Sequence, residues 1–269
     1  MDAIRVTVRR GSTVEAVHHV HVVSTDGHQA GDDLVCHLRS SMKPLQAVPL
    51  LEGYDDLPVE ELAIACASHQ AEPAQLAAVR ALLARAGAQV DDLENGTQPG
   101  RPDGKLGHNC SGKHAGMLAA CVAHGWPPHP YRDPDHPLQR RIAAVVGPGV
   151  GAIDGCGVPT YAMPLSRMAE VFTTLPEPIV AAMRARPELI GGEGADDTDF
   201  MQALPGWVAK RGAEGLFTAL SPDGAGWAFK VEDGSTRALR PALGQVLGID
   251  AFRTVEVTNS LDEVVGSIA

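Results

Sequence analysis

The sequence predicts an α+β protein in which strands from both ends of the chain share one sheet and helices lie between them. Residues 4–38 and 253–268 are rich in β-branched side chains, whereas residues 45–247 contain many stretches with apolar residues at helical spacing. No internal repeat, low-complexity tract or linker interrupts the 269 residues. We therefore expect a single domain over residues 1–269.

The N-terminal segment is expected to form strands. Valines dominate residues 6–23, and Gly11-Ser12 and Asp26-Gly27 supply turns between the apolar runs. A third short strand, residues 34–38, leads directly into Arg39-Ser40. A strand that delivers a serine to a helix start is well suited to present a nucleophile.

Helices are predicted where apolar residues recur three and four positions apart. The first is expected over Leu45–Leu51, where Pro49 should kink or shorten it and Gly53 should end it. Further helices are expected over residues 59–67, 72–86, 118–122, 137–146, 165–175, 178–186, 200–204 and 237–247. Residues 91–107 and the proline-rich residues 126–137 are expected to be irregular.

The C-terminal part returns to strands. Residues 216–220 and 226–231 flank the turn Ser221-Pro222-Asp223-Gly224 and are predicted to form a hairpin. Residues 253–257 and 264–268 are predicted to close the chain as strands of the same sheet.

Composition argues against several classes of protein. The net charge is −11 and no basic cluster is denser than Arg140-Arg141, so we expect no nucleic-acid partner. No stretch approaches the ~20 apolar residues that span a bilayer, and residues 1–5 lack the start of a signal peptide, so no membrane partner is expected. Five widely spaced cysteines do not resemble a disulfide framework. A cytoplasmic protein with reduced thiols is the expectation.

The residue pair most suggestive of chemistry is Ser40 and Lys43. At the start of a helix, this spacing places a hydroxyl and an amine one turn apart on the same face. A serine needs a neighbouring base to become a nucleophile, and a buried lysine held neutral can be that base. A capping serine beside a solvated lysine is the alternative interpretation of the same residues.

Two other residues could extend this pair. Ser68 precedes His69-Gln70 and is either a second catalytic hydroxyl or the cap of the helix that begins near Glu72. Lys230 lies on an apolar strand, next to Phe229, and is either solvated or lines a site.

A third group contains Cys110, Lys113 and His114, together with Asp154 and Cys156 far along the chain. Two thiolates and a nitrogen ligand suit zinc. A cysteine and a histidine four residues apart share one helix face, so ligand chemistry alone favours His114 as the third ligand. Two buried apolar cysteines without a metal remain the alternative.

Six segments, in this order along the chain, resemble the L-asparaginase II family, the Rhizobium etli type of asparaginase. The resemblance runs from about residue 4 to the end of the chain, and the run His108–Met117 is its most specific part. The segments are Arg39–Gln46, Cys66–His69, His108–Met117, Asp154–Pro159, Gly212–Gly215 and Phe229–Lys230.

The resemblance implies a fold similar to serine β-lactamases and glutaminases, with a central antiparallel sheet and helices. It also implies homodimers that hydrolyse L-asparagine to L-aspartate and ammonia. By the same resemblance Ser40 is the nucleophile with Lys43 as its base, and Ser68 and Lys230 form a second Ser-Lys pair.

Cofactor and substrate residues follow from the same resemblance. The zinc ligands become Cys110, Lys113 and Cys156, which displaces His114 to a supporting position behind the ligands. A lysine binds zinc only as a neutral amine, so the metal must depress its pKa. The expected substrate-binding residues are Arg39, His69, Asn109 and Asp154.

The chain departs from the family pattern in a short N-terminal section and at Ala71, where a glycine is frequent. Ala71 follows Ser68 by three residues, so it bears on the geometry of that loop. Two other functions remain open: a Ser-Lys hydrolase acting on another amide, such as a peptidase or lactamase, and a non-catalytic zinc- or amino-acid-binding sensor.

Overall fold

The computed structural model describes all residues, 1–269, and the chain forms two compact units. The first unit contains Met1–Cys36, Pro164–Thr173 and Arg211–Ala269, and the second contains His37–Met163 and Thr174–Lys210. Each unit is therefore assembled from stretches that are distant in the sequence. An antiparallel sheet dominates the first unit and helices dominate the second, which confirms the α+β class.

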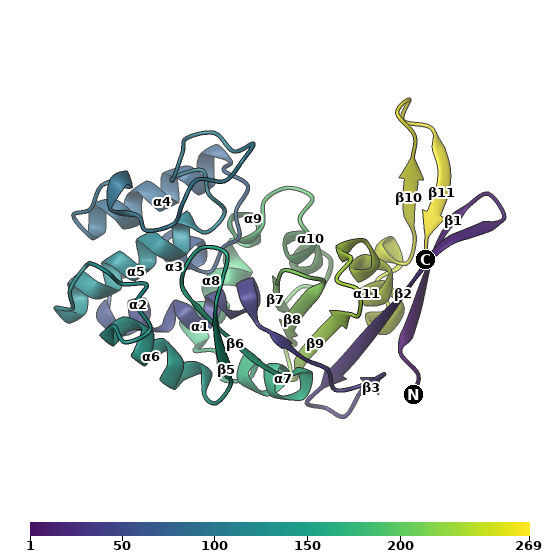
Figure 1. The fold of residues 1–269 in the computed structure, drawn as a ribbon, viewed down its shortest axis with the longest axis horizontal. Helices are drawn as coiled ribbons and strands as arrows, with labels where there is room; N and C mark the ends of the chain where they lie inside the picture. Colours follow the sequence, from purple (N-terminus) through teal and green to yellow (C-terminus); the bar gives the residue numbers. More distant parts are fainter. The chain divides into compact units, whose positions relative to one another are not determined.

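The sheet of the first unit joins both ends of the chain, as predicted. Its strands lie in the order β10-β11-β1-β2-β9-β8, all pairs are antiparallel, and β3 pairs with β2 (Figure 1). Val8 on β1 faces Ile268 on β11, and Val22 on β2 faces Phe229 on β9. The bounds are β1 (Ile4–Arg10), β2 (Thr13–Ser24), β3 (Gln29–Ala30), β8 (Leu216–Leu220), β9 (Gly226–Val231), β10 (Val255–Thr258) and β11 (Val264–Ile268).

Helices cover this sheet and explain why its inner face is apolar. Val6 and Val20 are fully buried, and α7 (Leu165–Phe172) packs on β2, β8 and β9. The helix α11 (Leu239–Leu247) contacts β1. Two short 3₁₀ turns, η3 (Thr236–Ala238) and η4 (Asp250–Phe252), flank α11.

The second unit is built around α5 (Ser111–His124), which α2, α3, α4 and α6 contact (Figure 1). Eleven of the 14 residues of α5, from Ser111 to Cys121, are buried, as expected for a central helix. The surrounding elements are α1 (Lys43–Gln46), α2 (Val48–Gly53), α3 (Val59–Ala65), α4 (Pro73–Arg85), η2 (Val90–Asp92), α6 (Pro137–Val146), α8 (Glu177–Ala185), α9 (Pro187–Ile190) and α10 (Asp196–Ala203).

Local sequence signals determine several of these boundaries. α1 ends at Gln46 and α2 begins at Val48, so Pro49 lies in the first turn of a new helix and shortens the preceding one, as predicted. The predicted helix over residues 72–86 is α4, whose capping box joins the backbone and side chains of Glu72 and Gln75.

The structure also contains elements that periodicity did not indicate. β5 (Val150–Ile153) and β6 (Pro159–Pro164) form an antiparallel hairpin around Asp154-Gly155-Cys156. All four residues of β5 are exposed, so the strand lacks an alternating apolar pattern. Of two further short strands, β7 (Val208–Arg211) was not predicted, whereas β4 (Val35–His37) is the strand predicted over residues 34–38. No helix is long and apolar enough to cross a bilayer.

One glycine sets how closely α5 approaches α3. A Cβ atom at Gly112 would lie 2.3 Å from the carbonyl oxygen of Ile64, so only glycine fits at this contact. Ile64 lies near the end of α3, four residues before Ser68. The close approach brings the start of α5, with Cys110, next to the loop that carries Ser68.

Candidate active site

Ser40 lies at the start of a helical stretch formed by η1 (Arg39–Met42) and α1. Arg39, directly before it, has a left-handed backbone with φ of +49°, and its N–H donates to Thr160 Oγ1 at 3.0 Å. A left-handed non-glycine residue at this position produces a sharp turn directly before Ser40, at some cost in strain. Ser40 is half-buried, and its hydroxyl makes no hydrogen bond.

Lys43 is fully buried and its amine has three neighbours. Nζ lies 2.7 Å from Ala67 O, 3.3 Å from Asn109 O and 2.8 Å from Ser68 Oγ. Burial lowers the pKa of Lys43, and the charge of Lys113 lowers it further against the opposing charge of Cys110. Nζ is the donor in all three contacts.

These contacts place the Lys43 amine beside a different serine from the one that the sequence predicted. The predicted partner was Ser40, whereas the structure places the amine against Ser68. The neighbouring Ser41 is fully buried and donates to Lys210 O at 3.0 Å, so its hydroxyl has a structural partner. Lys43 is therefore a buried base within reach of Ser68 and one helical turn from Ser40.

The loop carrying Ser68 is held on both sides. The N–H of Ser68 donates to Ile190 O at 2.8 Å. His69, fully buried, accepts from the Ala71 N–H at Nδ1 over 3.1 Å, so its proton is on Nε2 and is donated to Ser111 Oγ at 2.8 Å. Ser111 in turn donates to Leu106 O at 2.6 Å. Both ring nitrogens of His69 are thus engaged within the protein.

Burial makes His69 a source of acid sensitivity, since it lowers the pKa of His69 from 6.5 to about 3. The unfolded chain takes up this proton near pH 6.5 while the folded chain stays neutral, so stability should fall as pH falls below 6.5. The expected slope is about 1.4 kcal/mol per pH unit. Urea unfolding between pH 7 and pH 4.5 measures it.

A pair of variants isolates this contribution. Over this range, His69→Asn should reduce the slope of the unfolding free energy against pH by about 1.4 kcal/mol per pH unit, which is the contribution of one proton. His129→Asn, at a position 45% exposed, should leave the dependence unchanged. Equal slopes for wild type and His69→Asn would assign the acid sensitivity to other groups.

Ala71 has a left-handed backbone, with φ of +65°. An L side chain is disfavoured there by about 1–2 kcal/mol, which explains physically why a glycine suits this position. Ala71→Gly should therefore raise the unfolding free energy, by up to about 1 kcal/mol after the entropy of the more flexible unfolded chain is subtracted. Denaturant unfolding at pH 7 measures the change.

The matched control is Ala81→Gly, at an exposed interior position of α4. There, glycine should destabilise the protein by about 1 kcal/mol. The same sign at both positions would contradict the strain assigned to Ala71.

Cys110, Lys113 and Cys156 form a buried cluster. The two cysteines are 5% and 6% exposed, and Lys113 Nζ lies 2.8 Å from Cys156 Sγ. The hydrogen bond from Cys156 holds the pKa of Cys110 well below its usual value, with further lowering by the charges of Lys43 and Lys113. The same bond, together with burial, raises the pKa of Cys156. The two thiols therefore have pKa values shifted in opposite directions, with that of Cys110 the lower.

The two thiols determine the direction in which the pKa of Lys113 is shifted. Burial alone would lower its pKa, but the charges of Cys156 and Cys110 outweigh burial and raise it. A metal ion would have to displace this proton to use the amine. No group of three His, Cys, Asp or Glu side chains is arranged as a metal site, so a three-donor set here requires the Lys113 amine.

Arg39 and Asp154 form an ion pair at the edge of this cluster. Arg39 Nε lies 2.5 Å from Asp154 Oδ1, which also accepts the Gly155 N–H at 2.8 Å. Burial raises the pKa of Asp154, but the charge of Lys113 and the bonds from Gly155 and Arg39 outweigh it and lower the pKa. Asn109 Oδ1 lies 3.2 Å from Cys110 Sγ. Asn109 and Asp154 therefore lie beside the cysteines, with Arg39 paired to Asp154.

Lys230 lies on β9 in the first unit and is 9% exposed. Its Nζ donates to Glu214 O at 2.7 Å and to Val231 O at 2.5 Å. These carbonyls anchor the amine within its own unit. Its pairing with Ser68 stays a prediction.

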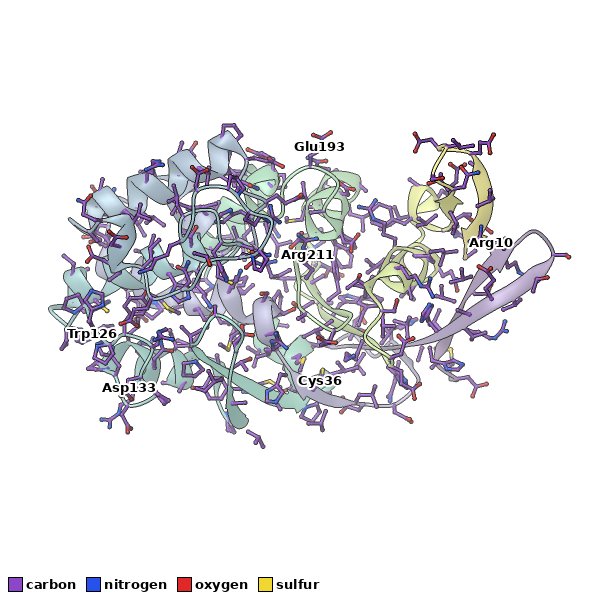
Figure 2. All side chains as sticks on the ribbon, turned by 45° about the horizontal axis from the view of Figure 1, so that its top comes forward. Arg10, Cys36, Trp126, Asp133, Glu193 and Arg211 are labelled. Carbon is purple, nitrogen blue, oxygen red and sulfur yellow. The ribbon has the colours of Figure 1, made fainter.

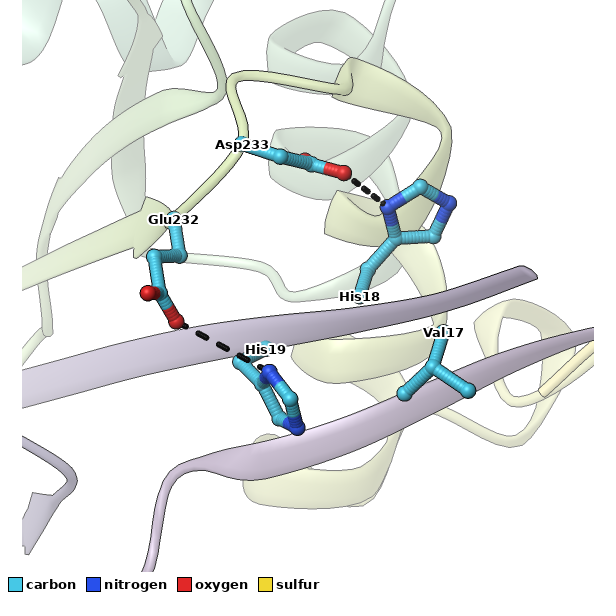
Figure 3. Close-up of a pocket in the computed structure, with 5 residues that line it drawn as sticks. All are labelled: Val17, His18, His19, Glu232 and Asp233. Carbon is cyan, nitrogen blue, oxygen red and sulfur yellow. Dashed lines mark hydrogen bonds and ion pairs between the residues drawn. The ribbon is translucent and has the colours of Figure 1, made fainter.

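The first unit also has a pocket of its own, of about 350 Å³, with histidines on its wall (Figure 3). His18 Nδ1 donates to Asp233 Oδ2 at 2.6 Å, and His18 Nε2 accepts from Arg237 Nε at 3.0 Å. His19 Nδ1 lies 3.7 Å from Glu232. Because both ring nitrogens of His18 have partners, this pocket is better described as a structural network than as a second reactive centre.

Sequence reasoning missed two residues that support the site. Thr160 on β6 holds the strained Arg39 backbone, and Tyr131 contacts His114 Nδ1 through its hydroxyl at 2.8 Å. Tyr131 lies in the loop between α5 and α6, where Figure 2 labels Trp126 and Asp133. Neither position has a sequence signal, because each acts through a contact made only in the folded chain.

Comparison with protein families identifies the family to which the chain belongs. A family model described as L-asparaginase II matches residues 6–267, and the chain belongs to this family. Membership implies an amidohydrolase, and the buried Lys43–Ser68 contact is consistent with that class. A search of curated proteins found no match.

Proposed function

We propose that this chain hydrolyses the side-chain amide of free L-asparagine to L-aspartate and ammonia. The observation that carries the proposal is a fully buried lysine amine, 2.8 Å from Ser68 Oγ and one turn from Ser40, in a member of the L-asparaginase II family. Burial lowers the pKa of Lys43, which increases the fraction of the amine able to accept a proton.

In the proposed mechanism Ser40 attacks the amide carbon and its proton passes to Lys43. Ser40 is the half-buried serine without a competing hydrogen bond, whereas Ser68 is 5% exposed and already contacts the amine. Backbone N–H groups stabilise the tetrahedral oxyanion. The C–N bond then breaks, and ammonia leaves with the proton that Lys43 took from Ser40, relayed through Ser68. Water hydrolyses the acyl-enzyme, which releases L-aspartate and restores the Ser40 hydroxyl.

The substrate's charged ends require fixed partners. Asp154 carries a lowered pKa and is suited to hold an α-ammonium group, with Arg39 orienting its carboxylate. Arg39, 32% exposed at its side chain, can also meet the α-carboxylate. Asn109 lies beside them, and His69 acts through the loop that it fixes.

The cluster beside these residues suits zinc in its donor chemistry. Two thiols and an amine lie together in a buried cluster, and the pKa of the Cys110 thiol is lowered there, which favours the thiolate form that binds zinc. Cys110, Lys113 and Cys156 would hold the ion. When bound, zinc supplies positive charge that helps to position the substrate, since the serine already has a base.

The direct test is ammonia release from L-asparagine by the purified protein, with added zinc and with a chelator. Rapid release supports the asparaginase, whereas no release in either condition overturns it. Turnover of nitrocefin instead would indicate a Ser-Lys hydrolase of another amide. Thermal stabilisation by asparagine without ammonia release would indicate a sensor.

Cys156→Ala tests the zinc proposal separately from the nucleophile. Loss of this ligand should raise KM for asparagine at least about tenfold and lower kcat less, because the site would lose binding rather than its base. Cys121→Ala, at a fully buried cysteine on α5, is the matched control and should leave KM unchanged. A chelator effect on KM alone would agree with this assignment, and a collapse of kcat alone would contradict it.

The finer fold assignment rests on the same residues. We infer an arrangement similar to serine β-lactamases and glutaminases, supported by Ser40 and Lys43 at a helix start and by Lys230 on a strand paired antiparallel with β8. An experimental structure compared with those enzymes tests it.

The assembly is proposed to be a homodimer, as the family resemblance implies. Val150 and Ile153 on β5, 71% and 61% exposed, support a contact with another copy. Sedimentation measurements would distinguish dimer from monomer. A cytoplasmic location is supported by five cysteines that are all unpaired.

A further inference from the structure

The residue directly before Ser40 is held by the β5–β6 hairpin at both its backbone and its side chain. The Arg39 N–H donates to Thr160 Oγ1 on β6 at 3.0 Å. Arg39 Nε lies 2.5 Å from Asp154 Oδ1, in the loop between β5 and β6. The hairpin therefore contacts the turn that presents Ser40 at two points, and both contacts are made to one residue.

Thr160 makes the backbone contact with its side chain. It is 2% exposed, and its backbone pairs with Ala152 across the hairpin. One residue before Arg39, the Leu38 N–H donates to the carbonyl of Tyr161 at 3.0 Å. The Thr160 hydroxyl thus accepts the N–H of the first residue after this backbone contact with β6.

Arg39 needs such support because its backbone is left-handed, with φ of +49°. This conformation is unfavourable for a residue with a Cβ atom and persists only where surrounding contacts enforce it. On the other side of Ser40 the chain is helical: Met42 and Lys43 have φ of −74° and −56°, and the Ser40 carbonyl accepts the Lys43 N–H. The backbone strain beside Ser40 therefore lies at Arg39.

We propose that Thr160 is a positioning residue that keeps Arg39 left-handed and thereby holds the Ser40 hydroxyl in place for attack on the substrate amide. This inference rests on the proposed function, since it takes Ser40 to be the nucleophile. Without the Thr160 hydroxyl, the Arg39 N–H loses its acceptor and the backbone is free to relax. Ser40 then loses its fixed orientation, and misplacement of a reacting group by about 1 Å can cost about 100-fold in rate.

Two substitutions at Thr160 separate the hydrogen bond from the packing of the side chain. Thr160→Val removes the hydroxyl and keeps the branched shape, whereas Thr160→Ser keeps the hydroxyl. We expect Thr160→Val to lower kcat for asparagine by about 10–100-fold and Thr160→Ser to recover most of it. KM should change less than kcat, because the Arg39 guanidinium keeps its contact with Asp154.

A purely structural role for Thr160 would give a different pattern. It would lower the amount of folded protein and leave kcat per folded molecule unchanged. Equal kcat in Thr160→Val and the wild type, or no recovery in Thr160→Ser, overturns the inference. If Thr160→Val does not fold, Thr160→Ala replaces it, since this variant differs from Thr160→Ser by the hydroxyl alone.

Thr7→Val is the matched control. Thr7 is also a buried threonine on a strand, β1, and its Oγ1 donates to a backbone carbonyl, Ala269 O, at 3.3 Å. This variant should lose stability in urea unfolding and retain kcat. An equal loss of kcat in Thr7→Val and Thr160→Val would show a general effect of destabilisation and overturn the inference.

A readout without asparagine separates this inference from the proposed function. An aryl sulfonyl fluoride labels a reactive serine: the O–S bond forms, fluoride leaves, and the serine proton passes to a base. Mass spectrometry of the labelled peptide gives the rate at Ser40. We expect labelling at least about tenfold slower in Thr160→Val and close to the wild-type rate in Thr160→Ser.

The labelling rates and the ammonia assay then give distinct outcomes. Equal rates at Ser40 in the wild type and Thr160→Val overturn the inference, whether or not asparagine is hydrolysed. Slower labelling of Thr160→Val in a protein that releases no ammonia from asparagine would support the inference and overturn the proposed function.

Discussion

Ser40→Ala is expected to lower kcat for asparagine hydrolysis by about 10⁴-fold or more, while the protein keeps its fold. Loss of a covalent nucleophile typically costs this much, because the remaining groups cannot form the acyl-enzyme. The Ser40 hydroxyl is half-buried and makes no hydrogen bond, so its removal leaves no unpaired partner. Ammonia release under saturating asparagine, with the melting temperature recorded in parallel, measures both effects.

The neighbouring serines are the controls for this experiment. Ser41→Ala removes only a bond to Lys210 O, so it should cost about 1 kcal/mol of stability and leave kcat nearly unchanged. Ser68→Ala tests the other candidate nucleophile. A burst of ammonia that persists in Ser68→Ala and vanishes in Ser40→Ala would establish Ser40 as the attacking group, and the reverse pattern would transfer that role to Ser68.

Lys43→Met should remove the proposed base and lower kcat by about 10²–10⁴-fold. Methionine matches the length of the buried stem, but it leaves Ala67 O and Asn109 O without a donor. Each unpaired buried carbonyl costs about 1–3 kcal/mol, so the variant should also melt at a lower temperature. Measurements below this melting temperature separate the catalytic loss from unfolding.

Lys105→Met is the matched control, because Lys105 Nζ also donates to two carbonyls, those of Asp91 and Leu93, at 2.7 Å each. It should lose comparable stability and retain kcat. If both lysine variants lose activity in proportion to their stability, Lys43 is structural and another group is the base.

Much of the fold could be predicted from short-range patterns. The helix α4 was expected over residues 72–86 from its 3.6-residue repeat, and β8 and β9 were expected from two β-rich runs around a turn. The hairpin of β5 and β6 was missed because all residues of β5 are exposed and two of them are Gly and Ala. The short helix α9 was missed because four residues carry too little periodicity.

In the candidate site, the sequence identified the types of residue but not all of their contacts. The motifs identified Ser40, Lys43, Cys110, Lys113 and Cys156, and the family model agrees with the motifs. They did not reveal that the amine of Lys43 meets Ser68, 25 residues away along the chain. Helical spacing alone favoured Ser40, since it counts only neighbours within one turn.

The sequence alone could not show which contacts His114 and Lys113, the two candidates for the third metal donor, make in the folded chain. Both residues follow Cys110 on α5 at spacings that permit a shared site. In the structure Lys113 Nζ lies 2.8 Å from Cys156 Sγ, whereas His114 Nδ1 lies 2.8 Å from the Tyr131 hydroxyl. Tyr131 lies in the proline-rich stretch that the sequence identified only as irregular.

By itself the sequence determined the α+β class, most helices and strands, the family and the types of reactive side chain. These depend on local periodicity and on residue identity, which the chain carries whether or not it is folded. Only the tertiary structure decided the partners of Lys43 and His114, the left-handed backbone at Arg39 and Ala71, and the burial that lowers the pKa of Lys43. Hydrogen-bond direction, strain and desolvation arise when distant segments pack against each other, so they have no local signature in the sequence.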